Sequence, residues 1–154
     1  MGAAGAGKST LAARLFEPGD ILSSDALREA IGGDAANQLA TRPAFAALNR
    51  DVRRRLAAGR VVVVDATNVE VHARRSLLRQ AALFGVRAVA IVVNPPPAVV
   101  HARNAARPGR VVPATVVDRH LALVARLGRD ADAIRDRLRA EGFDDVHVFA
   151  MAPD

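Results

Sequence analysis

Residues 2–9 read GAAGAGKS and satisfy the phosphate-loop pattern G-x-x-x-x-G-K-[ST]. Glycines let consecutive backbone N–H groups approach phosphate oxygens without obstruction from a Cβ atom. A helix that begins near Lys8 adds unpaired N–H groups and the positive end of its dipole. Lys8 is the only lysine of the chain and falls on the motif position, which argues against a chance match in a Gly- and Ala-rich stretch. The stretch therefore predicts a nucleotide-phosphate site and leaves the reaction open.

The pattern predicts that the loop and the start of the following helix bind a nucleotide, which we expect to be ATP with Mg²⁺. Lys8 is expected to reach the β- and γ-phosphates, and the Ser9 hydroxyl to ligate Mg²⁺. The full set of residues expected to contact the nucleotide here is Gly2, Gly5, Ala6, Gly7, Lys8, Ser9 and Thr10.

Only Met1 precedes the loop, although such a loop normally follows a buried β-strand. We expect that Met1 is an internal or mis-called start, or the edge of a shortened chain, and that the missing first strand lies upstream. Without that strand, Gly2 and Ala3 would lack an anchor, and the loop would be mobile in the absence of ATP.

Composition favours one folded domain over residues 1–154, because 51% of the 154 residues are apolar and no cysteine offers a disulfide or thiolate metal site. No apolar run reaches the roughly 18 residues of a membrane helix, and no cleavable signal begins the chain. We therefore expect a cytoplasmic protein without membrane attachment or an obligate protein partner. The formal charge of +6 favours a polyanionic partner such as nucleic acid, or serves solubility alone.

Apolar runs and helical patterns alternate along the chain. Strands are expected at 20–25, 61–64, 86–94 and 144–150, with 61–64 buried, and helices at 8–16, 26–32, 43–59, 70–84, 95–107, 114–128 and 130–142. This alternation predicts an α/β fold, a three-layer α/β/α arrangement around a parallel sheet. Residues of about 97–127 would form a helical lid.

Two carboxylates follow predicted strands, where parallel sheets place their ligand crevice. Asp25 is positioned to accept a proton from an attacking hydroxyl, with Arg28 one helical turn away to hold an anionic group. Alternatively, Asp25 only caps the helix at 26–32. Asp65 ends a run of valines; it either acts on Mg²⁺ through water or orders Thr67 and its neighbour.

An arginine-rich segment, HARNAARPGR, places Arg103 and Arg107 four residues apart on one helix face, and Arg110 follows in a Pro-Gly turn. Guanidinium groups match phosphate oxygens and stabilise charge on a transferring phosphoryl group. The alternative is a solvated basic helix face.

The stretches GAAGAGKST, SSDALR, VVVVDATNV and HARNAARPGRVVP follow one another in a characteristic order and spacing. In this the chain resembles P-loop polynucleotide 5′-hydroxyl kinase domains, above all the kinase module of bacterial end-healing polynucleotide kinase–phosphatases. The resemblance covers nearly the whole chain. It implies an adenylate-kinase-like P-loop NTPase fold and transfer of the ATP γ-phosphate to a 5′-OH end of DNA or RNA.

The resemblance also implies roles for single residues. Asp25 would be the general base, Arg28 would grip the acceptor's 3′-phosphate, and Thr67 and Val112 would line the acceptor pocket. The donor phosphates would be contacted by Arg103 and Arg107, while Arg110 matches less firmly. Lys8, Asp25 and Arg107 would carry the catalysis.

Two other functions fit the same residues. A P-loop kinase that acts on a nucleoside, sugar or antibiotic hydroxyl would use the same scaffold, and the fold alone does not separate it from a polynucleotide kinase. A non-catalytic nucleotide-binding module is the third possibility, because the chain contains no phosphatase or ligase segment.

Overall fold

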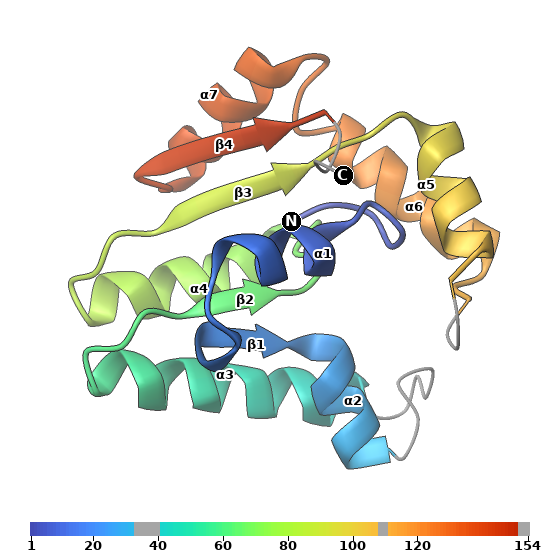
Figure 1. Ribbon diagram of the computed structural model, residues 1–154. Helices are drawn as coiled ribbons and strands as arrows, with labels where there is room; N and C mark the ends of the chain where they lie inside the picture. The colour runs from blue at the N-terminus through green and yellow to red at the C-terminus, as the bar shows by residue number, and fades with distance from the viewer. Residues whose placement is uncertain (33–40, 108–110, 151–154) are drawn as a thin grey trace. The chain divides into compact units, whose positions relative to one another are not determined.

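The computed structural model describes residues 1–32, 41–107 and 111–150 (Figure 1). They fall into two compact units. One combines Met1–Lys8 with the described part of Thr67–Asp154, and the other is Ser9–Ala66. Parallel strands and helices alternate through both units, so the predicted α/β class is confirmed. The single domain over 1–154 stays a prediction.

The unit Ser9–Ala66 is built on two short parallel strands. Strand β1 (Ile21–Ser23) pairs with β2 (Val63–Asp65) so that Ser23 lies opposite Asp65. The helices near these strands are α1 (Lys8–Leu15), which the 3₁₀ turn Pro18–Asp20 follows, α2 (Ser24–Gly32) and α3 (Thr41–Ala57). Because the strands are parallel neighbours, both carboxyl ends lie at one edge of the sheet.

Helix α3 buries one stripe of small and aliphatic side chains. Ala44, Leu48 and Val52 recur at helical spacing and are buried, as their periodicity predicts. Pro43 lies in the first turn of α3, where its missing N–H is not needed. This stripe packs α3 against its unit and supports β1.

The other unit contains strand β3 (Val89–Val93), which pairs in parallel with β4 (Asp145–Phe149). Its helices are α4 (Val71–Leu83), α5 (Pro97–Ala105), α6 (Ala114–Ala125) and α7 (Ala131–Glu141). Figure 1 shows α7 beside β4 and α5 beside α6. The continuous apolar run of β3 is typical of a parallel strand covered on both faces.

Two apolar clusters form the core of this unit. The first joins β3, β4 and α7 through Ala90, Val92, Leu127, Ile134, Leu138 and Val146. The second lies under the phosphate loop and consists of Ala3, Ala4, Val100, Val112 and Val117. The second cluster therefore gives the loop a packed floor formed by α5, α6 and Val112, which lies two residues before α6.

Met1 and Gly2 are hydrogen-bonded to their surroundings. The Val93 N–H donates to the Met1 carbonyl at 2.8 Å, and the Met1 ammonium donates to the Ile91 carbonyl. The Gly2 N–H donates to the Thr67 carbonyl at 2.9 Å. The expectation that Gly2 and Ala3 lack an anchor is therefore wrong for the chain as it stands, because β3 and Thr67 hold this end. The upstream strand stays a prediction.

Several predicted elements differ at their ends. The expected strand 20–25 ends at Ser23, and Asp25 lies in the first turn of α2 rather than at the end of the strand. The expected buried strand 61–64 begins only at Val63, because the β1–β2 register pairs only Val63 to Asp65. Val61 lies before this strand and is 62% exposed. Leu11 is buried, whereas Leu15, four residues further along the same helix, is 53% exposed at the last residue of α1. No described helix is long and apolar enough to cross a membrane.

Candidate functional site

The phosphate loop packs directly against helix α5. Gly5 has a φ of +86°, and a Cβ atom there would lie 2.6 Å from the Val100 carbonyl oxygen and 3.1 Å from the Asn104 Cβ. Only glycine fits this conformation and this close approach. Gly5 thus allows the loop to pack against α5, in addition to leaving the backbone N–H groups of the loop unobstructed.

Lys8 closes the loop on itself. Its Nζ donates to the Ala3 carbonyl at 2.7 Å, and the Ala6 N–H donates to the same carbonyl at 3.2 Å. Helix α1 begins at Lys8, so its N-terminal N–H groups and positive dipole end face the loop. The predicted arrangement of loop, lysine and helix start is present.

The predicted magnesium residues meet. The Ser9 hydroxyl donates to the Asp65 carboxylate at 2.6 Å, and Asp65 is the last residue of β2. A hydroxyl and a carboxylate are oxygen groups of the kind that Mg²⁺ takes as ligands, so this pair would suit the metal of a bound nucleotide. Mg²⁺ keeps several water and phosphate ligands, so two protein groups suffice. The described residues contain no group of three or more His, Cys, Asp or Glu side chains suited to a metal.

Asp25 and Arg28 form an ion pair in the first turns of α2, with side chains 34% and 13% exposed. The helix begins at Ser24, and the Ser23 hydroxyl accepts the Ala26 N–H at 3.3 Å. The interpretation of Asp25 as the helix cap is therefore wrong, because Ser23 occupies that position. The Asp25 carboxylate instead pairs with the Arg28 guanidinium one turn further along α2.

Thr67 and Asn68 connect β2 to α4. Thr67 is half-buried and its carbonyl binds the loop residue Gly2, while Asn68 is buried with a φ of +48°. Arg74 was not anticipated from the sequence. It is 1% exposed, and its Nη1 donates to the carbonyls of Asn68 at 3.2 Å and Val69 at 2.7 Å.

The rest of the Arg74 guanidinium binds a carboxylate on α7. Nε donates to Glu141 Oε2 at 2.6 Å and Nη2 to Oε1 at 2.9 Å, which is a bidentate pair. The hydrogen bonds from Arg74 hold the pKa of Glu141 below its ordinary value, against the opposing effect of burial. In the sequence, the only indication that Arg74 is buried is its position on the same helical face as the apolar residue Leu78, four residues further along α4.

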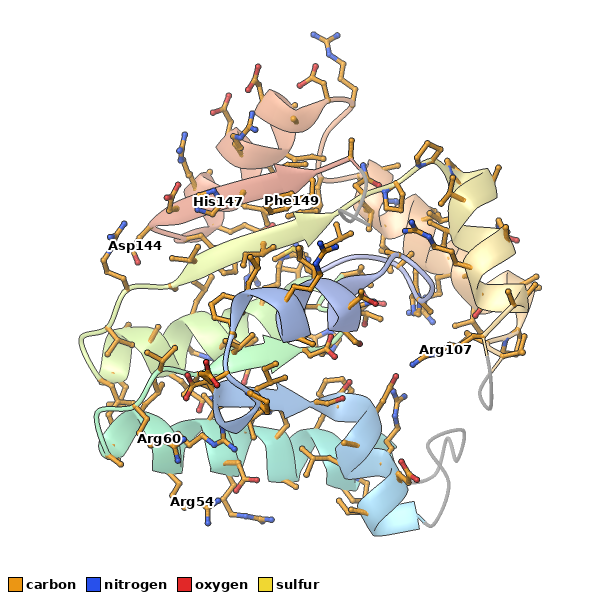
Figure 2. The ribbon with its side chains drawn as sticks, viewed as in Figure 1. Arg54, Arg60, Arg107, Asp144, His147 and Phe149 are labelled. Atoms are coloured by element: carbon orange, nitrogen blue, oxygen red, sulfur yellow. The ribbon has the colours of Figure 1, made fainter. Side chains whose placement is uncertain are left out.

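The arginine-rich segment HARNAARPGR does not form the continuous helix face that its spacing predicts. Helix α5 ends at Ala105, so Arg103 lies in its last turn and Arg107 follows beyond it (Figure 2). The two arginines therefore do not share one helix face. The reason is local, because Arg107 precedes Pro108 in the sequence and a residue before proline avoids the helical region. Arg110 lies outside the described residues.

Asn104, also unanticipated, joins α5 to Val112, which lies two residues before α6. Its Nδ2 donates to the Val112 carbonyl at 2.8 Å, and its Oδ1 accepts the Val112 N–H at 3.1 Å. Asn104 is 5% exposed, so these bonds satisfy groups that water does not reach. Val112 itself packs beneath the phosphate loop with Ala3 and Ala4. Its predicted contact with the acceptor stays a prediction.

A glycine-rich loop with its lysine, a helix start and a serine–aspartate pair at a strand end define a P-loop nucleotide-binding protein. Residues 1–127 match the family model AAA_33, described as an AAA domain, and the chain belongs to this P-loop NTPase and kinase-like family. A comparison with curated proteins found no match. Glu141 lies beyond the matched segment.

Proposed function

We propose that this protein is an ATP-dependent kinase that transfers the γ-phosphate to a 5′-OH end of DNA or RNA. One observation carries the proposal. The parallel pairing of β1 with β2 sets the Asp25–Arg28 pair and the Ser9–Asp65 pair at the carboxyl ends of neighbouring strands. A base for an acceptor hydroxyl and a site for phosphate-bound metal thus occupy the same sheet edge.

The donor side rests on the loop that precedes Ser9 in the chain. Backbone N–H groups of the loop and the start of α1 would cradle the phosphates of ATP. To reach the β- and γ-phosphates, Lys8 exchanges its bond to the Ala3 carbonyl for phosphate oxygens. Mg²⁺, held by Ser9 and Asp65, would neutralise charge on these phosphates when bound.

The acceptor side rests on Asp25. Its carboxylate would take the proton of the attacking hydroxyl as the acceptor oxygen bonds to the γ-phosphorus. The bond from that phosphorus to the β–γ bridging oxygen breaks, and ADP leaves. The neighbouring Arg28 offers a guanidinium fork to an acceptor phosphate, which a nucleic-acid end possesses and a simple alcohol lacks. The net charge of +6 supports a polyanionic acceptor.

A small-molecule kinase is the second candidate, and one observation favours it. The chain contains no Trp or Tyr, whereas proteins that hold single strands usually stack bases on aromatic rings. An acceptor such as a nucleoside or sugar needs no such platform.

The deciding experiment incubates the protein with γ-³²P-labelled ATP, Mg²⁺ and a 5′-OH oligonucleotide of DNA or RNA. The matched control is the same oligonucleotide already carrying a 5′-phosphate. Label on the 5′-OH strand alone is expected. Label on a panel of small hydroxyl compounds and on neither oligonucleotide would replace the proposal by the second candidate. ATP binding without transfer to any acceptor would identify a non-catalytic module.

A further inference from the structure

A buried charge pair links helices α4 and α7. Arg74 is 1% exposed, and the bidentate partner Glu141 has a side chain that is 12% exposed. Removing two charges from water costs several kcal/mol each, and hydrophobic side chains of similar volume usually pack as stably. Helix packing alone therefore does not explain why a charge pair lies here.

The remaining contacts of the guanidinium explain its presence. Nη1 donates to the carbonyls of Asn68 and Val69, the turn that follows the half-buried Thr67. Asn68 has a φ of +48°, a left-handed conformation that is uncommon for residues with a Cβ atom, although asparagine adopts it more readily than most. A rigid five-donor fork can hold this turn and Glu141 at once, which an ammonium or an apolar side chain cannot.

The turn is also held from its other side. The Thr67 carbonyl accepts the N–H of Gly2, the first residue of the phosphate loop. Thr67 thus lies between the loop and the Arg74 guanidinium, and both ends of the short segment 67–69 are hydrogen-bonded.

We propose that Arg74, held by Glu141, is a positioning residue that sets the Thr67 hydroxyl for the phosphate acceptor. The inference rests on the proposed kinase function. It assigns a part in the reaction to α7, which lies beyond the segment matched by the family model. ATP binding should depend little on the pair, because the loop has its own floor on α5 and α6.

The test is the double variant Arg74→Met/Glu141→Met, which replaces the pair by apolar side chains of similar length. We expect a thermal midpoint within a few degrees of wild type. The KM for the acceptor should rise about tenfold or more, while the ATP dissociation constant changes less than about twofold. Arg137→Ala is the matched control, because the exposed Arg137 also pairs with Glu141, at 3.4 Å, and should leave both constants unchanged.

Glu141→Gln separates positioning from stability. It leaves a buried guanidinium with reduced compensation, so it should lower the thermal midpoint more than the double variant does. The guanidinium still binds the Asn68 and Val69 carbonyls, so the acceptor KM should rise less than in the double variant. If the acceptor KM rose more in Glu141→Gln, the less stable variant, than in the double variant, the KM would follow the loss of stability and the proposal would be overturned.

Amide hydrogen exchange gives a readout that needs no activity. In the double variant the amides of residues 67–69 should exchange at least about tenfold faster, while those in the middle of α4 keep their protection. Unchanged exchange at 67–69 would overturn the positioning role, even if the wild-type protein proved to transfer no phosphate and the proposed function failed. If the double variant does not fold, the same measurement on Glu141→Gln decides, with a smaller acceleration at 67–69 expected.

Discussion

Single residues of this site combine two tasks. Lys8 binds the Ala3 carbonyl and so shapes the loop that it is expected to serve in phosphate binding. Asp25 stands in the first turn of α2, where a negative charge suits the helix dipole, and pairs with Arg28. Because Ser23 already caps the helix, Asp25 can be replaced without loss of the cap.

Asp25→Asn tests the proposed base. The variant should bind ATP normally and lose transfer by about 10²–10⁴-fold, because an amide accepts no proton from the hydroxyl. Initial rates of label transfer and an ATP titration measure the two effects. Asp51→Asn is the control, since Asp51 makes the same i,i+3 pair with Arg54 on α3, and its rate should stay normal. Near-normal transfer by Asp25→Asn would contradict the assignment.

At the scale of elements, the seating of the loop on α5 depends on Gly5. Gly5→Ala combines a φ of +86° with a Cβ placed 2.6 Å from the Val100 carbonyl oxygen. We expect ATP affinity to fall at least about tenfold, because the loop must leave its floor. Isothermal titration with ATP measures the loss.

Gly59→Ala is the control for backbone strain alone. Gly59 has a φ of +67°, but a Cβ there would meet no atom within 4 Å. It should cost about 1 kcal/mol of stability and leave ATP affinity unchanged. Equal ATP affinities in the two variants would show that the contact with α5 is unimportant.

The link between α5 and the start of α6 depends on Asn104. Asn104→Ala should lower the free energy of unfolding by about 2–4 kcal/mol, because the buried N–H and carbonyl of Val112 both lose their partner. Urea denaturation measures the change. Asn49→Ala removes a side-chain bond to the Phe45 carbonyl, which lies inside α3 where a backbone N–H can still reach it, and should cost less than about 1 kcal/mol. A similar small loss at Asn104 would mean that water replaces the side chain.

At the scale of the whole molecule, the Arg74–Glu141 pair ties stability to pH. The pKa of Glu141 is lowered from 4.5 in the folded state, chiefly by its hydrogen bond to Arg74. The unfolded state therefore binds the proton first as pH falls. The stabilisation from this group is complete above that ordinary value and disappears as pH drops through the lower folded pKa.

Urea unfolding of wild type and Glu141→Gln from pH 7 down to pH 3 checks this dependence. The stability difference between the two proteins should be constant near neutrality and shrink in the acid range. Wild type should show the steeper decline. A difference that stays constant throughout would mean that Glu141 keeps its ordinary pKa in the fold.

The phosphate loop, the alternation of strands and helices and the place of Asp65 at the end of β2 were all predictable from the sequence, because each depends on neighbours close along the chain. The end of α5 before Arg107 also depends on a local feature, because Pro108 follows. The prediction from helical spacing ignored this proline and extended the helix to residue 107. Val61 shows the limit for strands, because the residue at which β2 begins depends on which partner residues β1 offers.

Arg74 and Asn104 mark what only the tertiary structure decided. In an arginine-rich chain, an arginine is expected at the surface. Arg74 is buried because α7 places Glu141, 67 residues away in sequence, next to the start of α4. Both hydrogen-bond partners of Asn104 likewise belong to Val112, eight residues further along the chain. The sequence by itself determined the phosphate-binding chemistry, because backbone conformation and residue type act locally. The pairing of buried polar groups was decided by the fold, because it requires surfaces distant in the chain to meet and exclude water.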